Sequence, residues 1–194
     1  MHNPSKDHLS VVIWILRYLK SSPERGLMLR KYGYLNVEGH SDANWAGSSD
    51  RKSTSGYFTF VGGNLITWRS KKQKVVVLSS AEAEFRGISK GVCELLWLRS
   101  LITEIGYTPS DEISLYCDNR AAIQIAQNSV QHDRAKHVEI DRHFIKEKLE
   151  AKIIKLSFVK SEDQLADVLT KVVSSRVFYN SLGKLGIEDI YAPT

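Results

Sequence analysis

The chain has 194 residues, of which 42% are hydrophobic and 25% are charged, as is ordinary for a soluble globular protein with one well-buried core. No apolar run approaches the roughly 20 residues that a membrane-spanning helix needs, so we expect no membrane association. The formal net charge of +5 favours a polyanionic partner. The two cysteines, Cys93 and Cys117, have neither a disulfide-framework pattern nor a zinc-binding spacing, which indicates an intracellular protein of the cytoplasm or nucleus.

The first part of the chain is predicted to contain one helix and three strands. Apolar side chains recur at helical spacing over residues 7–20, and Pro23 and Gly26 end that pattern. Gly62, Gly63 and Asn64 form a turn signal between two of the strands. We expect the strands at residues 34–42, 54–62 and 65–68, with 75–78 either continuing the third strand or bridging into the next helix.

The second part alternates helices with strands. Three meandering strands followed by such an alternation predict an α/β fold with a five-stranded mixed sheet flanked by helices. The pattern predicts strands at residues 112–117 and 153–159, and helices at 80–104, 119–127, 137–150, 161–171 and 174–185.

Four carboxylates stand in distinctive local contexts. Asp42 and Asp118 each end a stretch with strand-like alternation, where a buried charge is costly unless a cation or a donor compensates it. Glu84 lies near the start of the 80–104 helix, two residues after Glu82, whose own acidity is explained by helix electrostatics. Asp167 lies among apolar residues of the predicted 161–171 helix.

Single acids delivered from four separate elements can build one site for a hard cation. Mg²⁺ in proteins is held by a few carboxylates together with water and substrate phosphate. The alternative for any one acid is that it is an ordinary solvated surface residue. The four contexts together favour a metal site for phosphodiester chemistry.

Basic residues precede the helix that carries Glu84. Arg69, Lys71, Lys72 and Lys74 follow Trp68 in the segment WRSKKQK. They suit a phosphate backbone that approaches an acidic metal cluster. They equally suit a solvated strand edge, where lysines prevent strand pairing, and the composition leaves both interpretations open.

Long, ordered motifs carry a resemblance to a known family. The segments SDANWAGSSDRKSTSGYFTFVGG, TWRSKKQKVVVLSSAEAEF, LYCDNRAAI, KHVEIDRHFIKEKL and QLADVLTK resemble the ribonuclease H domain at the end of copia-type (pseudoviral) retrotransposon Pol polyproteins. The resemblance implies a ribonuclease H-like fold and cleavage of the RNA strand of RNA–DNA hybrids with two Mg²⁺ or Mn²⁺ ions. The family's four catalytic and metal-binding acids fall on Asp42, Glu84, Asp118 and Asp167.

The resemblance also suggests a domain organisation and partners. Residues 1–33 would connect a reverse transcriptase to the ribonuclease H domain at 34–172, and 173–194 would form a C-terminal amphipathic helix and tail. We expect a monomer that binds an RNA–DNA hybrid, with a reverse transcriptase domain as a further partner. Asn119 and Arg120 are candidates for contacting the RNA 2′-hydroxyl, although Asn119 also suits the role of helix cap.

Two departures from the family pattern leave an alternative open. The segment between the last strand and Asp167 has no room for the His-bearing loop of cellular ribonucleases H, so the source of proton transfer is not apparent. Asn44 stands where copia-type domains usually carry Asp. The chain also begins within the connecting segment, so the alternative function is a catalytically inactive or domesticated remnant that binds hybrids.

Overall fold

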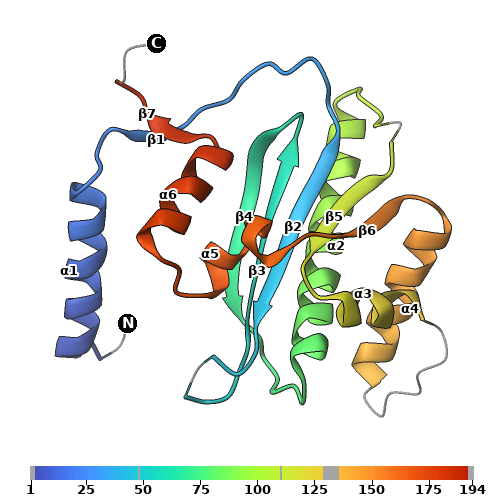
Figure 1. Ribbon diagram of the computed structural model, residues 1–194, viewed down its shortest axis with the longest axis horizontal. Coiled ribbons are helices and arrows are strands. Elements are labelled where there is room, and N and C mark those ends of the chain that lie inside the picture. The colour runs from blue at the N-terminus through green and yellow to red at the C-terminus, as the bar shows by residue number, and fades with distance from the viewer. Residues whose placement is uncertain (1–2, 48, 110, 129–135, 192–194) are drawn as a thin grey trace.

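A computed structural model of the protein describes residues 3–47, 49–109, 111–128 and 136–191 (Figure 1). Its centre is a mixed sheet of five strands in the order β4-β3-β2-β5-β6, which confirms the predicted fold class. β2, β3 and β4 are antiparallel neighbours, whereas β5 runs parallel to both β2 and β6. The strands are β2 (Val37–Asn44), β3 (Thr54–Val61), β4 (Asn64–Lys72), β5 (Ile113–Cys117) and β6 (Ile154–Phe158).

Helices cover both faces of the sheet. Alternate residues of a strand point to opposite faces: the Tyr57 hydroxyl donates to Glu94 of α2 at 2.8 Å, while Phe58 packs in a cluster with Ala166 and Leu169 next to α5. The larger core lies between the sheet and α2, and includes Phe85, Ile88, Val92, Leu95, Leu115 and Ile145. The helices are α2 (Ser80–Glu104), α3 (Arg120–Gln127), α4 (Lys136–Glu150), α5 (Asp167–Thr170) and α6 (Ser175–Lys184).

The long helix α2 begins and ends as the sequence predicts. Ser79 is its N-cap, and the Ser79 hydroxyl accepts a hydrogen bond from the Glu82 backbone N–H at 3.1 Å. Just after the helix, Gly106 has a φ of +95°, a conformation that glycine adopts without steric cost. Capping at one end and a glycine at the other thus fix the length of the helix that carries Glu84.

The predicted helix over residues 161–171 is wrong. The structure has a short 3₁₀ helix η1 (Ser161–Asp163), then an extended residue, Gln164, and then α5. The buried Gln164 amide donates to the Ser41 carbonyl at 3.0 Å, and its Oε1 accepts from the Ala166 backbone N–H at 3.2 Å. The bond to Ser41 in the sheet and the local bond to Ala166 hold Gln164 extended and interrupt the helix, although the apolar spacing alone is helical.

Strand boundaries also differ from the sequence-based expectation. β2 begins at residue 37 instead of 34, and β4 continues to Lys72, beyond the predicted 65–68. Residues 75–78 are not a strand; the buried Val77 instead packs against Ala43 of β2 and Ala83 of α2.

A small second sheet lies beside the main one and was not predicted. β1 (Arg25–Leu27) pairs antiparallel with β7 (Ile187–Asp189), so segments from both ends of the chain lie side by side (Figure 1). Strands of three residues are too short for an alternating pattern to reveal them.

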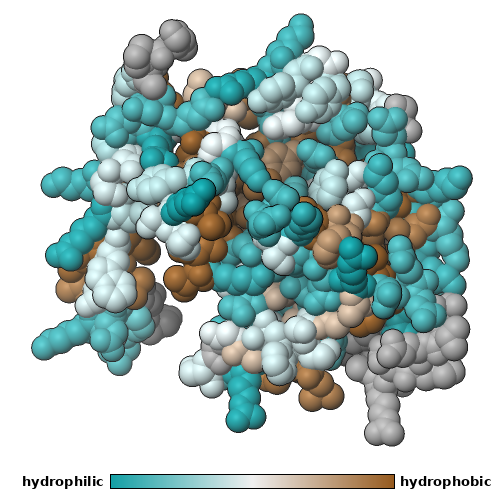
Figure 2. Space-filling view, in the orientation of Figure 1, coloured by the Kyte–Doolittle hydropathy of each residue, from teal (hydrophilic) through white to brown (hydrophobic). Residues whose placement is uncertain are grey.

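The predicted N-terminal helix is present as α1 (Lys6–Lys20). No residue of this fully described helix is buried, and Figure 2 shows apolar side chains exposed along it. Among the described residues, no helix has the length and apolar character required to cross a membrane.

Candidate active site

Two of the four acids are brought together by parallel strand pairing. Glu38, Gly39 and His40 of β2 pair with residues 114–116 of β5, so Asp42 and Asp118 follow at the same edge of the sheet. β5 ends at Cys117, whereas β2 continues to Asn44. Because β5 stops first, the side of β2 next to Asp42 is open to groups from other elements.

Glu84 reaches this edge because α2 packs closely on β2. A Cβ added at Gly87 would lie 3.4 Å from the Asp42 carbonyl oxygen, and one at Gly91 would lie 3.4 Å from Leu115. The two glycines therefore let the helix approach the strand, which places Glu84, almost one turn before Gly87, beside Asp42.

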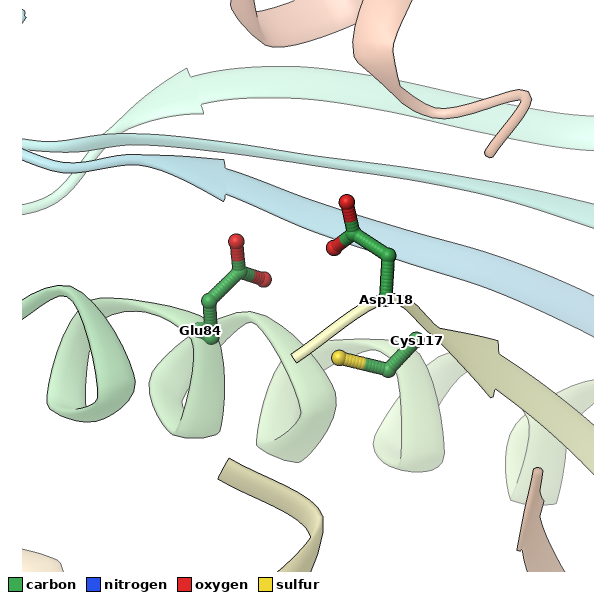
Figure 3. Close-up of side chains that lie close together, drawn as sticks. All are labelled: Glu84, Cys117 and Asp118. Carbon is green, nitrogen blue, oxygen red and sulfur yellow. The ribbon is translucent and has the colours of Figure 1, made fainter. Parts of the chain in front are cut away.

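The structure brings all four acids into one cluster. One oxygen from each of Asp42, Asp118 and Asp167 lies within 4.8 Å of the other two. A second group of ligand atoms also lies within 4.8 Å of one another: an oxygen of Glu84, an oxygen of Asp118 and the Sγ of Cys117. Figure 3 shows Glu84 rising from α2 towards Asp118 at the end of β5. Asp118 belongs to both groups and links them.

Burial makes this cluster electrostatically unfavourable without a cation. Asp42 is 0% exposed and Glu84 is 5% exposed. Burial raises the pKa of Glu84 to about 9, and the charge of Asp42 acts in the same direction. Burial also raises the pKa of Asp167, to about 6, although a hydrogen bond from Lys171 opposes the shift. Among the described residues, Glu84 Oε2 has no hydrogen-bond partner.

Lys171 and Thr170 are part of the cluster, and neither was predicted from the sequence. Lys171 Nζ lies 2.9 Å from Asp42 Oδ1 and 2.8 Å from Asp167 Oδ1. The Thr170 hydroxyl donates to the other oxygen of Asp42. Burial lowers the pKa of Lys171, but its hydrogen bonds to Asp167 and Asp42 outweigh this effect and the net pKa is raised. The i, i+4 spacing of Asp167 and Lys171 was the available signal.

The donor set fits hard divalent cations. Four carboxylates from separate elements offer the oxygen ligands that Mg²⁺ and Mn²⁺ prefer. The unpartnered, buried Oε2 of Glu84 is an acceptor that a cation would satisfy. Asp42, Glu84, Asp118 and Asp167 are therefore the residues that could hold metal.

Asn44 stabilises the placement of α5. Its side-chain amide donates to the Thr170 carbonyl at 3.2 Å. A carboxylate at this position could not donate that bond. Asn44 is thus compatible with the arrangement of the acids.

The two candidates for 2′-hydroxyl contact have structural partners. Asn119 is the N-cap of α3, and its Oδ1 accepts from the Ala122 backbone N–H at 3.0 Å. The Arg120 guanidinium carbon lies 4.1 Å from the centre of the Phe158 ring. Both residues directly follow Asp118, so they remain next to the acidic cluster.

The predicted basic residues line a groove on the other flank of α2. We call it the basic groove; it has a volume of about 810 Å³, and no acid of the cluster is among the described residues that line it. Glu82 and Arg86 line the groove from α2. Each is two positions from Glu84 in the sequence, which corresponds to about 200° of rotation around the helix axis. The structure therefore does not bring the basic residues and the four acids together. The basic side chains of the groove are Arg69, Lys71, Lys72, Lys74, Arg86 and Lys90.

Two plant Pol polyproteins are similar to this chain in sequence over most of its length. No family model matches the sequence. The chain is 42% identical over 188 residues to the retrovirus-related Pol polyprotein from transposon RE1 of Arabidopsis thaliana, which covers 96% of this chain but 13% of the relative. It is 38% identical over 180 residues to the corresponding polyprotein from transposon TNT 1-94 of Nicotiana tabacum, covering 92% of this chain and 13% of that relative.

A solved structure supports the fold assignment. The structure of LC11-RNase H1 in complex with RNA/DNA hybrid superimposes with a TM-score of 0.50 at 15% identity, covering 70% of this chain and 94% of that one. At this identity the similarity concerns the fold. The chain therefore belongs to the copia-type, retrovirus-related Pol polyproteins, of which it corresponds to a segment with a ribonuclease H-like fold.

Proposed function

We propose that this segment is a metal-dependent endonuclease that cleaves the RNA strand of RNA–DNA hybrids. The observation that carries the proposal is the convergence of Asp42, Glu84, Asp118 and Asp167 from four separate elements. Membership of the Pol polyproteins favours a nucleic-acid substrate, and the solved neighbour of similar fold is described as a complex with RNA/DNA hybrid. A reverse transcriptase domain is the further partner that we propose.

The four acids would hold two Mg²⁺ or Mn²⁺ ions. Bound there, two such ions would supply activation of the attacking water and stabilisation of the leaving 3′ oxygen. Asp42, at the centre of the cluster, lies beside Glu84 and shares Lys171 with Asp167, while Asp118 belongs to both groups of ligand atoms. We therefore propose that Asp42 and Asp118 are the central acids of the set that would hold these ions, with Glu84 and Asp167 on either side.

Lys171 has a defined role in the metal-free protein. Its ammonium group contacts both Asp42 and Asp167 directly, and its single positive charge offsets part of their negative charge. Its side chain is 36% exposed, so it has room to move aside when cations enter. Lys171 thus keeps the acids together before metal binds.

Substrate positioning would come from residues around the cluster. Asn119 and Arg120 follow Asp118 and are proposed to face the RNA strand, with Asn119 also serving as the cap of α3. Phosphate contacts in the basic groove would hold a part of the duplex that passes around the start of α2. Such contacts position a duplex without reacting with it.

A cleavage assay tests the proposal directly. The purified chain is incubated with end-labelled RNA–DNA hybrid, double-stranded RNA or double-stranded DNA, each with Mg²⁺ or with EDTA. We expect cutting of the RNA strand of the hybrid with Mg²⁺ alone, and no cutting by Asp42→Asn, although this variant retains the fold and hybrid binding.

Two outcomes would count against this function. Cutting by Asp42→Asn at the wild-type rate would exclude a mechanism that depends on the acidic cluster. Tight hybrid binding without any cutting by the wild-type chain would favour the alternative, an inactive hybrid-binding remnant.

A further inference from the structure

The acidic cluster contains one potential ligand that hydrolysis with Mg²⁺ does not use. Cys117 is the last residue of β5 and is 0% exposed. Its Sγ lies within 4.8 Å of ligand oxygens of Glu84 and Asp118. Figure 3 shows the three side chains around a common space. Magnesium prefers oxygen ligands, so this thiol has no part in the function proposed above.

The buried carboxyl group of Glu84, which has one oxygen without a hydrogen-bond partner among the described residues, points into the same space. Glu84 is 5% exposed, and its Oε2 has no hydrogen-bond partner among the described residues. Its carboxyl group is directed towards Asp118 and Cys117 (Figure 3). A buried acceptor without a donor is costly unless a cation satisfies it.

The geometry suits a cation that accepts sulfur as well as oxygen. Zn²⁺ binds thiolate sulfur at about 2.3 Å and carboxylate oxygen at about 2.0–2.2 Å, which places tetrahedral ligands about 3.5 Å apart. The present separations are at most 4.8 Å, so the three ligand atoms need to close by no more than about 1.3 Å, through rotation of the side chains. The Asn119 backbone N–H, 3.4 Å from Cys117 Sγ, would also stabilise a sulfur that carries negative charge.

We propose that Glu84, Cys117 and Asp118 form a binding site for a thiophilic divalent cation such as Zn²⁺ or Cd²⁺. Binding forms a metal–sulfur bond to Cys117 and metal–oxygen bonds to Glu84 and Asp118. It releases to solvent both the thiol proton of Cys117 and the proton that the buried Glu84 carboxyl group holds in the metal-free protein. The site shares Glu84 and Asp118 with the proposed Mg²⁺ ligands, so the two kinds of cation exclude each other. A soft metal at this position would inhibit the segment by displacing its hard metal.

Cadmium absorption gives a test that is independent of hydrolysis. Metal-free protein is titrated with Cd²⁺, and the ultraviolet charge-transfer band of a cadmium–thiolate bond is followed. We expect the band in the wild type and in the control variant Cys93→Ser, because Cys93 lies on α2 outside the cluster. We expect no band in Cys117→Ser, whose fold is checked by circular dichroism and thermal melting.

A second variant keeps the thiol and removes a carboxylate. Asp118→Asn should weaken Cd²⁺ binding by about tenfold or more, because even loss of a hydrogen-bonding group around a metal ligand typically lowers metal affinity by that factor. Excess Mg²⁺ should weaken Cd²⁺ binding to the wild type. This measurement stands even if Cys117→Ser does not fold.

Four outcomes would overturn the proposal. The folded wild type shows no band, Cys117→Ser keeps the band, Cys93→Ser abolishes the band, or Asp118→Asn and Mg²⁺ leave the Cd²⁺ affinity unchanged. Because no substrate is used, these outcomes are separate from success or failure of the cleavage assay.

Discussion

Lys171 gives the metal-free cluster a cation of its own. Its ammonium group contacts Asp42, which is fully buried, and Asp167, which is half-buried. Removing one partner of a buried ion pair leaves the other charge uncompensated. The same ammonium repels an incoming divalent cation, so it should affect stability and metal affinity in opposite directions.

We therefore expect Lys171→Met to lower the free energy of unfolding in EDTA by about 1–3 kcal/mol, since the ammonium is partly exposed and solvent screens the pair. The same variant should bind Mn²⁺ about fivefold more tightly or better. Urea unfolding and calorimetric titration measure the two effects. Lys160→Met is the matched control, because that side chain is 74% exposed and contacts Glu162 at the surface. Equal behaviour of the two variants would contradict this role of Lys171.

Glu84 should make the metal-free protein less stable as pH rises. Its pKa is raised from 4.5 to about 9 by burial first and by Asp42 second. Between these two values the folded protein keeps a proton that the unfolded chain has released, so the free energy of unfolding falls with increasing pH. One such proton contributes a slope of up to about 1.4 kcal/mol per pH unit.

The matching experiment compares the wild type with Glu84→Gln in EDTA at pH 5.5 and pH 8. We expect the stability of the wild type to fall more than that of the variant over this interval, and saturating Mg²⁺ to remove most of the difference. Identical pH slopes for the two proteins would show that Glu84 does not keep its proton in the fold.

At this scale the sequence reveals the acids but not their neighbours. Asp42 and Asp118 are recognisable because each ends an alternating strand, which is an unusual place for a charge. Cys117 looks like an ordinary core residue, and Lys171 like an ordinary surface lysine. Cys117 meets Glu84 because α2 packs on β5, and Lys171 meets Asp42 because α5 packs on β2. No local pattern encodes either approach.

At the scale of elements, α5 is positioned by the sheet beneath it. The Ser70 hydroxyl donates to the Leu169 carbonyl at 2.6 Å, and a Cβ added at Gly56 would lie 2.6 Å from Leu169 Cβ. Gly56 pairs with both Asp42 and Ser70, so it lies directly between them in the sheet. The absence of a side chain at Gly56 lets α5 lie close enough to bring Asp167 to Asp42.

Gly56→Ala should therefore displace α5 without changing any acid. We expect the free energy of unfolding to fall by about 1–3 kcal/mol, as for other overpacked sites, together with weaker Mn²⁺ binding. Gly183→Ala in α6 is the control, because an added Cβ there meets nothing within 4 Å and alanine favours the helix. If Gly56→Ala binds Mn²⁺ as the wild type does, close contact between α5 and the sheet is not what places Asp167.

The elements differ in how well the sequence predicts them. The α2 helix is predicted correctly because a cap, a long apolar pattern and a terminal glycine agree. The 161–171 stretch is predicted wrongly because its apolar spacing is helical, whereas the buried Gln164 bonds to Ser41 in the sheet and breaks the helix. The local sequence pattern thus predicts a helix correctly where all its signals agree, as in α2. It fails where one polar side chain forms a hydrogen bond to a strand that is distant in the sequence, as in the 161–171 stretch.

At the scale of the whole molecule, α2 separates the acidic cluster from the basic groove. Glu84 lies on one flank of the helix, and Arg86 and Lys90 line the groove on the other. The sequence places the basic segment just before this helix. It does not reveal on which flank of α2 the basic side chains lie, because that depends on how β4 and α2 pack. Under the proposed function, a duplex bound at both places would span the two flanks of α2.

The basic groove should consequently affect hybrid binding more than turnover. Replacing Arg69, Lys71, Lys72 and Lys74 with Gln should weaken binding and reduce the log–log salt slope by roughly 0.7–0.9 for each phosphate that is no longer neutralised. Lys72 already contacts Asp50 at 3.2 Å, so we expect a change nearer to that of three phosphates than of four. A charge-matched control replaces four basic residues of the N-terminal segment with Gln: Lys6, Arg17 and Lys20 of α1, and Lys31 after β1.

Binding titrations at several salt concentrations distinguish the two interpretations of these side chains. Phosphate binding by these residues predicts a smaller slope in the groove variant than in the control, with single-turnover cutting of bound hybrid nearly unchanged because no metal ligand is altered. Protection of a strand edge predicts equal slopes and more aggregation of the groove variant. Since β4 is one of the two edge strands of the five-stranded sheet, both effects act on the same surface. The salt slope is the measurement that reports on phosphate binding.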